Sequence, residues 1–281
     1  MSRKRYPSDL TDEQWAVLEP LVPDAVPGGR PRKHAMRDIL DALFYVNREG
    51  CRWRALPHDF PPWKTVYNYF AAWEQDGTWQ ALLTALRMRV RTAAGRNPGP
   101  SAACADSQSV KTAHGGAAVG TDGGKKVRGR KRHIATDTLG LLLAVVVTAA
   151  NVDDGVAARD LFAWMPGRDF PRLRVVYADG KYHNHQLYAW LRRHRRPYRV
   201  EVVSRPEGRK GFEPLPKRWV VERTLAWLNR SRRLSKDYEH TPASSQAAVR
   251  VSAIHHMLRR LRPTRLCHEF RYKRPERKWV A

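Results

Sequence analysis

Acidic side chains are scarce in this 281-residue sequence. There are 27 Asp and Glu against 52 Lys and Arg, which leaves a formal net charge of +25. A basic excess of this size favours a large polyanion, nucleic acid above all, as the partner. The excess is greatest over residues 181–281, which hold 26 basic and 8 acidic side chains. We therefore expect nucleic-acid contact to be heaviest in this C-terminal third.

Cysteine and long apolar runs are also scarce. Cys51, Cys104 and Cys267 are odd in number and far apart, so they fit neither a disulfide framework nor a cysteine-based zinc site. We interpret all three as small apolar residues. The longest apolar candidate, 139–150, is a dozen residues, against the roughly 20 needed to span a bilayer. No apolar segment typical of a secretory signal follows the N-terminus. These absences predict a soluble, cytoplasmic protein without membrane contact.

The first 95 residues show helical periodicity. Thr11 and Gln14 have the spacing of a capping box ahead of a first helix, and apolar residues recur at helical spacing from Met36 to Gly50. A third helix is predicted after Pro62, with an apolar back formed by Trp63, Val66, Phe70 and Trp73. Its polar front consists of Lys64, Thr65 and Asn68. A fourth helix begins near residue 78, and the tryptophans of the region are interpreted as core residues.

A break in periodicity at residues 95–100, Gly-Arg-Asn-Pro-Gly-Pro, predicts a domain boundary. Beyond it, strand patterns alternate with helical ones. Strands are expected over 102–110, 130–137, 141–148, 174–178 and 198–203, and helices over 154–162, 185–193, 217–230 and 244–261. Residues 141–148 are continuously apolar, which is typical of a strand covered on both faces. The alternation predicts an α/β fold with a mixed sheet flanked by helices.

Three acidic residues occupy positions suited to chemistry. Asp106 lies on the first strand, Asp179 closes the apolar strand 175–178, and Glu222 lies on the helix over 217–230. Strand ends in α/β sheets are common ligand sites. Carboxylates beside a polyanion would repel it, unless divalent metal lies between them. Hard oxygen ligands hold Mg²⁺, and two ions about 3.5–4 Å apart can activate a nucleophile and stabilise the leaving oxygen of a phosphodiester.

Each of these acids also has an ordinary structural interpretation. Asp179 with Gly180 is a common turn dipeptide, Glu222 could pair with Arg218 one helical turn away, and Asp106 could bond backbone amides. Three further acids are assigned to structure: Asp137 to a hairpin turn, and Asp153 and Asp154 to a helix cap. His183 and His185 lie near Asp179, but no partner spacing supports a zinc site.

Several segments in a fixed order carry a family resemblance. They are Tyr6 to Leu21, Gly50 to Pro57, Ala105 to Lys111, Gly129 to His133, Asp137 to Leu141, Ala178 to Gly180, and Arg218 to Arg230. In these segments the chain resembles the bacterial insertion-sequence transposases of the DDE type, in the group named after insertion sequence five. The likeness covers nearly the whole length.

The resemblance implies a ribonuclease-H-like catalytic domain over 101–262 and a basic tail over 263–281. Asp106, Asp179 and Glu222 match the D, D and E of the motif, and they would hold two Mg²⁺ ions, with Mn²⁺ as a substitute. The related signature around the last acid has Tyr where this chain has Leu215 and Lys where it has Asn229. This departure concerns which side chain contacts phosphate near the cut, with Arg218, Arg230 and Lys131 as candidate DNA contacts.

The resemblance also implies double-stranded DNA as the partner, both as terminal inverted repeats and as target. Residues 1–95 are then an all-α, helix-turn-helix-like domain that binds the element ends, with the third helix in the major groove. Its candidate contacts are Lys64, Thr65 and Asn68, and the basic loop adds Arg30, Arg32 and Lys33, although that loop could be only a solvated turn. We expect a homo-oligomer on DNA, associated with the bacterial nucleoid.

Two other functions compete with a transposase that cleaves and transfers DNA strands. One is a non-catalytic repressor descended from a transposase, and the other is a structure-selective nuclease without strand transfer. The intact set of three acids favours the enzyme, because a pure binder gains nothing from carboxylates placed against phosphates. The specific N-terminal domain argues against the nuclease.

Overall fold

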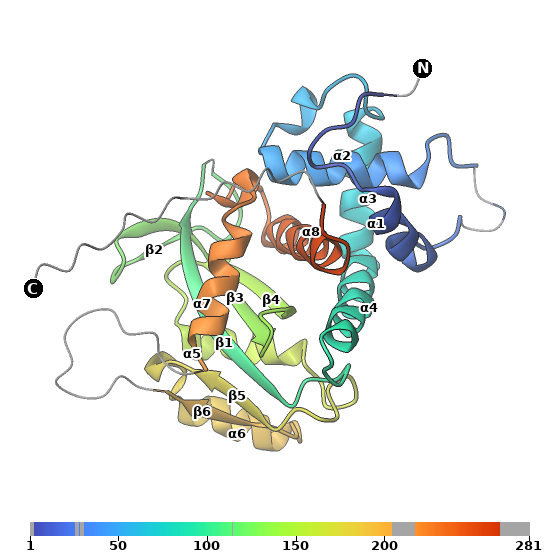
Figure 1. Ribbon diagram of the computed structural model, residues 1–281. Helices are drawn as coiled ribbons and strands as arrows, with labels where there is room; N and C mark the ends of the chain where they lie inside the picture. The colour runs from blue at the N-terminus through green and yellow to red at the C-terminus, as the bar shows by residue number, and fades with distance from the viewer. Residues whose placement is uncertain (1–2, 26–27, 29–30, 114, 204–216, 265–281) are drawn as a thin grey trace, which may run out of the picture.

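A six-stranded mixed sheet forms the centre of the molecule (Figure 1). The computed structural model describes residues 3–25, 28, 31–113, 115–203 and 217–264. The strand order is β2-β3-β1-β5-β6, and β4 pairs with β3 as well. The strands are β1 (Ala102–Lys111), β2 (Gly120–Asp122), β3 (Val127–Asp137), β4 (Leu142–Ala149), β5 (Val175–Ala178) and β6 (Arg199–Val202). The pairs β1–β3, β2–β3 and β3–β4 are antiparallel, and β1–β5 and β5–β6 are parallel.

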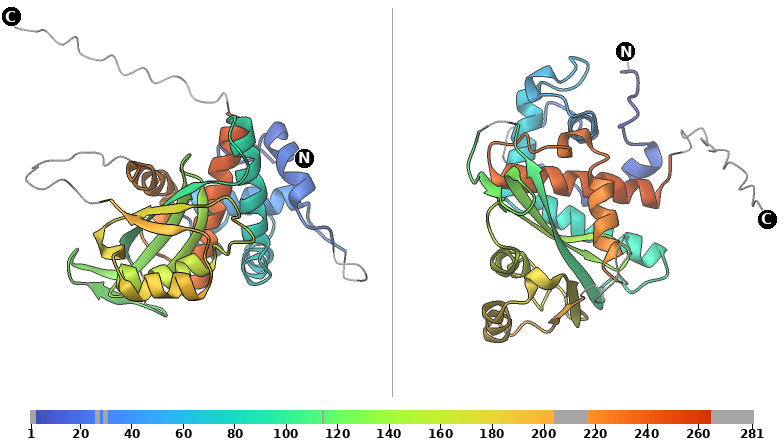
Figure 2. Two further views of the ribbon diagram at one scale, coloured as in Figure 1. Left: turned by 90° about the horizontal axis from the view of Figure 1, so that it is seen from below. Right: turned by 90° about the vertical axis from the view of Figure 1, so that its left-hand side faces the viewer.

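Helices cover both faces of this sheet. On one side lie α5 (Asp154–Ala163) and α6 (His185–Arg193), and on the other lie α7 (Trp219–Leu228) and α8 (Pro242–Leu261), as Figure 2 shows from two further directions. Strand β4 is apolar from Leu142 to Val147 because these residues are divided between the two cores. Val145 and Val147 pack with the α7 and α8 side, and Leu143 and Val146 pack with the α5 and α6 side. The predicted mixed sheet flanked by helices is confirmed.

In the part of the chain that the structure describes, four α-helices precede the sheet, as the sequence predicts. They are α1 (Asp12–Leu18), α2 (Met36–Glu49), α3 (Trp63–Gln75) and α4 (Thr78–Ala93). Thr11 and Gln14 form the predicted capping box at the start of α1, and Gly50 ends α2 in the left-handed conformation that glycine adopts without strain. No helix in the described part of the chain is both long and apolar enough to cross a membrane.

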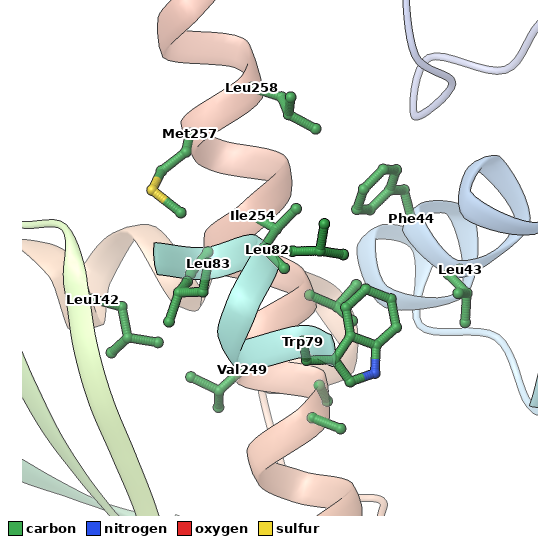
Figure 3. Close-up of a cluster of buried hydrophobic side chains, with 14 of the residues drawn as sticks. Leu43, Phe44, Trp79, Leu82, Leu83, Leu142, Val249, Ile254, Met257 and Leu258 are labelled. Carbon is green, nitrogen blue, oxygen red and sulfur yellow. The ribbon is translucent and has the colours of Figure 1, made fainter. Parts of the chain in front are cut away.

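Helix α8 packs between the sheet and the N-terminal helices. Leu82 of α4 lies beside Ile254 of α8 (Figure 3), and the Phe44 ring of α2 stacks on His255 of α8 at 4.5 Å. Buried residues of α1 to α4, α8 and the sheet form one continuous cluster. The predicted boundary at 95–100 falls in the connection between α4 and β1, but the hydrophobic core is not interrupted there.

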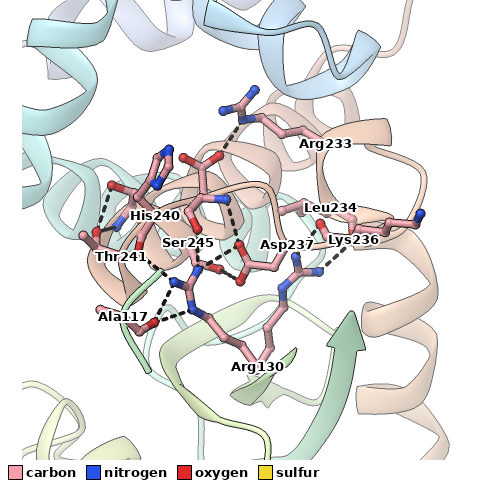
Figure 4. Close-up of polar contacts among 12 residues, drawn as sticks. Ala117, Arg130, Arg233, Leu234, Lys236, Asp237, His240, Thr241 and Ser245 are labelled. Carbon is pink, nitrogen blue, oxygen red and sulfur yellow. Dashed lines mark hydrogen bonds and ion pairs between the residues drawn. The ribbon is translucent and has the colours of Figure 1, made fainter. Parts of the chain in front are cut away.

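Two fully buried arginines join β3 to the segment that precedes α8 (Figure 4). Arg130 donates to the carbonyl oxygens of Glu239 at 2.6 Å and His240 at 2.8 Å, and lies 3.2 Å from Asp237 Oδ1. Arg132 donates to the carbonyl of Leu234 at 2.7 Å. Because each guanidinium has several fixed donors, these bonds hold the segment in one place relative to the sheet.

A continuous core predicts that a defect in α4 weakens the whole chain. Leu83→Ala, which removes a fully buried side chain, should lower the free energy of unfolding by about 2–5 kcal/mol. Met88→Ala on the same helix, where Met88 is 45% exposed, should change it by no more than about 0.5 kcal/mol. Denaturant unfolding, followed by far-ultraviolet circular dichroism and tryptophan fluorescence, should give one coincident transition. Two separated transitions would show that the N-terminal helices unfold independently.

Candidate active site

The sheet register places Asp106 beside Asp179. Strands β1 and β5 run parallel with Ala102 opposite Val175 and Cys104 opposite Tyr177. Continuing this register by two residues brings Asp106 level with Asp179, immediately beyond the last residue of β5. Asp106 remains within β1, where it pairs with β3. The two carboxylates therefore lie just beyond the parallel pairing of β1 with β5, at the carboxyl end of β5, and such strand ends in α/β sheets bind ligands.

The Asp106 carboxyl is held in an unfavourable electrostatic setting. Its pKa is raised to about 6, mainly by burial and in smaller part by the charge of Asp179. Three groups act in the opposite direction: the Ser107 amide, which donates to Asp106 Oδ1 at 2.7 Å, the Arg218 guanidinium, and the Lys125 ammonium. Since the net effect is upward, the ionised carboxylate lacks sufficient positive charge nearby, which is the setting that a bound cation would relieve.

Asp179 has a structural role as well as its place beside Asp106. It caps the short 3₁₀ helix η3 (Gly180–Tyr182), and its Oδ1 accepts a hydrogen bond from the Lys181 amide at 3.1 Å. The turn interpretation of Asp179 is thus confirmed. It is compatible with a site role, because the same hydrogen bond fixes the carboxylate next to Asp106.

A buried hydroxyl lies among the carboxylates. Tyr182 is 1% exposed, and its hydroxyl has no hydrogen-bond partner among the described residues. Burial raises the pKa of this hydroxyl well above its usual value, and the charges of Asp106, Asp154 and Asp179 add to the effect. An unsatisfied polar atom in a buried acidic site indicates a place for an ion or water. Carboxylate oxygens around such a place are the donors that hard divalent cations prefer.

Glu222 lies on α7, whose buried side is the predicted one. Between described residues Glu222 forms no ion pair with Arg218, so the predicted helical pair is not formed. Arg218 Nη1 lies 3.4 Å from the carbonyl oxygen of Val203 instead, at the end of β6. In the described ranges, no three His, Cys, Asp or Glu side chains form a group that could hold a metal ion. The structure therefore brings Asp106 and Asp179 together and leaves Glu222 outside a compact three-ligand group.

Asp154, which the sequence predicts to be part of a helix cap, also belongs to a buried ionic cluster. Asp153 is the N-cap of α5, and Asp154 occupies the first turn. Asp154 Oδ1 lies 3.3 Å from Lys131 Nζ and 3.6 Å from His133 Nδ1. Burial lowers the pKa of His133 to about 4, so that ring is neutral at neutral pH. Lys131 is then the principal counter-charge of Asp154.

The expected DNA contact by Lys131 does not fit this arrangement. Its side chain is buried, and its ammonium donates to the Val152 carbonyl at 2.8 Å as well as facing Asp154. Sequence reasoning also missed the burial of Arg130 and Arg132 in the same basic run. The sequence indicates this burial only through the place of the run, which lies on a predicted strand immediately before the apolar strand over 141–148.

The remaining candidate DNA contacts lie in two regions. On α3, Lys64 and Asn68 are exposed and Thr65 is half-buried, opposite the buried Val66, Phe70 and Trp73. Lys33 is exposed, Arg32 donates to the Pro23 carbonyl at 2.6 Å, and Arg30 lies outside the described residues.

Arg230 is exposed beyond the end of α7, and its charge contributes, after burial, to lowering the pKa of His256, which contacts Trp227. Among these candidate DNA contacts, Arg218 is the residue whose charge lowers the pKa of Asp106.

Comparisons with known proteins agree with this architecture. Residues 97–258 match the family model described as "Transposase DDE domain", and residues 10–83 match one described as "Putative transposase of IS4/5 family". The chain is 39% identical over 121 residues to a Burkholderia cepacia protein named "Putative transposase for insertion sequence element IS402". That match covers 40% of this chain and 54% of the relative, so the chain spans about half of that protein's length.

A second Burkholderia cepacia relative is named "Insertion element IS402 uncharacterized 16.2 kDa protein". It is 29% identical over 119 residues, which cover 40% of this chain and 78% of the relative. A Sinorhizobium fredii protein of uncharacterised function is 32% identical over 77 residues, covering 27% of this chain and 62% of that protein.

The raised pKa of Asp106 predicts a change in stability when its charge is removed. A folded-state pKa of about 6, above the usual 3.8, means that the folded protein binds this proton more tightly than the unfolded chain does. The contribution to stability is therefore present at low pH and is lost as the pH rises through about 6. At pH 7.5 in EDTA, Asp106→Asn should raise the free energy of unfolding by about 1–2 kcal/mol, with almost no gain at pH 4.

The matched control is Asp153→Asn, because asparagine caps a helix about as well as aspartate. Asp41, whose pKa burial raises to about 7, is present in all three proteins and cancels in the comparison. Denaturant melts at both pH values provide the measurement. An Asp106→Asn protein that is no more stable than the wild type at pH 7.5 would show that Asp106 is not electrostatically strained.

Proposed function

The chain belongs to the family of DDE transposases, and from this premise we propose that it is the transposase of an insertion sequence. In this proposal it binds the terminal inverted repeats of the element, cleaves DNA strands there, and joins the freed ends to target DNA. The observation that carries the proposal is the juxtaposition of Asp106 and Asp179 at the edge of a ribonuclease-H-like sheet. Action on DNA would associate the protein with the nucleoid.

The carboxylates fit a divalent cation. Asp106 and Asp179 would hold Mg²⁺, or Mn²⁺ in its place, and Glu222 is the proposed third donor. The metal would activate the attacking water or hydroxyl and stabilise the leaving oxygen of the phosphodiester. The protein's part is to hold the oxygen donors still. The Ser107 amide fixes Asp106, the Lys181 amide fixes Asp179, and both bonds come from rigid elements of the fold.

Arg218 is the proposed phosphate contact near the cut. Its guanidinium acts on Asp106 and lies by the end of β6, whereas the family's lysine position is taken by Asn229, exposed at the end of α7. A fixed fork of donors suits the non-bridging oxygens of a phosphate. Arg230, beyond the last turn of α7, would contact the DNA further along its path.

The N-terminal helices are the proposed readers of the element ends. Lys64, Thr65 and Asn68 on α3 would face the major groove, supported by Arg32 and Lys33. Since the N-terminal helices share one core with α8 and the sheet, their orientation to Asp106 and Asp179 is fixed. A DNA end bound on α3 would then reach the carboxylates in a defined register. Joining two ends to one target calls for two such sites, and we propose a homo-oligomer on DNA.

A non-catalytic repressor remains the second candidate, and one observation favours it. Within the described residues Glu222 is not assembled with the two aspartates into a group of three possible ligands. Such a protein would bind the element ends with the same helices and would leave the DNA intact. Both functions give specific, salt-dependent binding. Cleavage separates them.

The proposal predicts that the three carboxylates are needed for cleavage and not for binding. Asp106→Ala, Asp179→Ala and Glu222→Ala should each slow Mg²⁺-dependent cleavage of labelled element ends by at least about 100-fold, because metal-held charge stabilisation is worth several kcal/mol. Affinity for the same DNA should stay within about 3-fold, since basic side chains supply the binding free energy. Denaturing gels and fluorescence anisotropy at one salt concentration measure the two quantities.

Asp153→Asn is again the matched control and should cleave at the wild-type rate. Full activity in Glu222→Ala, with loss in both aspartate variants, would restrict the metal site to Asp106 and Asp179. A wild-type protein that binds the ends tightly and never cleaves them with Mg²⁺ or Mn²⁺ would identify the repressor.

A further inference from the structure

A cavity of about 590 Å³ opens between the N-terminal helices and the segment that precedes α8. It lies against the 3₁₀ helix η2 (Trp53–Ala55), the first turns of α3, and residues 238–241. None of the residues that line it belongs to the Asp106 site. Pockets of roughly 300–1,000 Å³ are the size that binds small ligands. The cavity is therefore large enough for a ligand of its own.

Aromatic rings form the cavity walls. They are Trp53, Trp63, Tyr67 and Tyr238. The Trp53 and Tyr67 rings meet edge to face, with centroids 5.2 Å apart, which holds both rings in place. The Arg54 guanidinium lies 5.7 Å from the Trp63 ring centroid, and Arg52 in the same wall is exposed. The cavity thus combines flat apolar surfaces with positive charge.

A buried ion pair forms another part of the lining. Arg233 Nε donates to Glu239 Oε1 at 2.6 Å, and Arg233 Nη1 donates to the Cys51 carbonyl at 2.9 Å. The same guanidinium lies 4.9 Å from the Trp53 ring centroid. Glu239 is therefore neutralised inside the protein and does not oppose an anionic ligand. Arg130 of β3 donates to the Glu239 carbonyl, and this hydrogen bond connects this side of the cavity to the sheet.

The segment Gly50 to Pro57 builds the wall, and the proposed catalytic role leaves this segment unexplained. Gly50 has a φ of +76°, and a Cβ at this position would lie 3.0 Å from Arg232 Cβ. Only glycine accepts both the conformation and the close approach without strain. The chain can therefore turn sharply after α2 and direct Trp53 toward Arg233. This turn places Trp53 in the cavity wall.

We infer that this cavity binds one unpaired nucleotide of the DNA, an inference that rests on the proposed function. Nucleobases stack on aromatic rings and on arginine, while the attached phosphate is attracted to arginine. A base within a duplex has both faces covered by its neighbours, so only an unstacked base could use these walls. Trp63 and Tyr67 lie on α3, the helix that carries the exposed Lys64 and Asn68. DNA bound along α3 would therefore pass the mouth of the cavity.

The test uses the full-length protein and two short duplexes of the same sequence. One is fully paired, and the other carries a single unpaired 2-aminopurine. The wild type should bind the second duplex more tightly by roughly 5- to 100-fold, the range expected for stacking one base on aromatic side chains. Stacking in the cavity should also quench the 2-aminopurine fluorescence. Anisotropy and fluorescence titrations at one salt concentration measure both effects.

Two variants assign the effect to the cavity. Trp63→Ala and Arg54→Gln should each remove most of the preference and of the quenching while keeping affinity for the paired duplex within about 3-fold. Both residues are at least partly exposed, so the fold should survive, which a thermal melt checks. Trp164→Ala is the matched control, because Trp164 is 47% exposed and lies at the end of α5, outside the cavity lining.

Several outcomes would overturn the inference. Equal affinity of the wild type for both duplexes would do so while leaving the proposed function intact, since DNA binding would still be seen. A preference that persists in Trp63→Ala would place the unpaired base elsewhere. A change in the oligomeric mass of Trp63→Ala, with nucleotide preference retained, would make the cavity a contact between copies of the chain. Failure of the wild type to bind either duplex would contradict the proposed function as well.

Discussion

Two carboxylates that repel each other, Asp106 and Asp179, are the constraint on which the candidate site depends. Asp106 cannot move away because it is hydrogen-bonded within the long strand β1, and Asp179 is fixed as the cap of η3. Partial burial removes much of the water that would screen them, and the pKa of Asp106 rises accordingly. A chain selected only for stability would avoid this arrangement, so its presence in the fold is evidence for a role that needs concentrated negative charge.

The rest of the molecule keeps this edge of the sheet in a fixed relation to the helical region. Helix α8 fills the space between the sheet and α1 to α4, and Arg130 and Arg132 hold the segment before it through backbone carbonyls. The same segment contributes Tyr238 and Glu239 to the aromatic cavity. Contacts with DNA on α3, in the cavity and at the carboxylates would thus all be made by one rigid unit.

Much of the fold could be predicted from the sequence, because local signals agree with the tertiary structure. The capping box at Thr11, the apolar strand β4 and the acid at the end of β5 all lie where their patterns predict. The burial of Lys131 could not be predicted, because its counter-charge at Asp154 comes from a distant helix. The sequence also did not indicate that one core continues past the predicted boundary at 95–100. That core depends on the packing of α8 against α4, two helices that are far apart in the sequence. The predicted pair of Arg218 with Glu222 is also not formed, because the Arg218 guanidinium lies by the Val203 carbonyl oxygen instead.

If Asp106 and Asp179 together bind a divalent metal ion, anomalous scattering from crystals of the full-length protein grown with MnCl₂ should locate it. A Mn²⁺ peak should lie within coordination distance, about 2.0–2.6 Å, of oxygens from both carboxylates. The same peak should be absent from Asp106→Asn crystals grown in the same way. A peak at Asp154, or none near Asp106 in the wild type, would show that the two aspartates do not form this site.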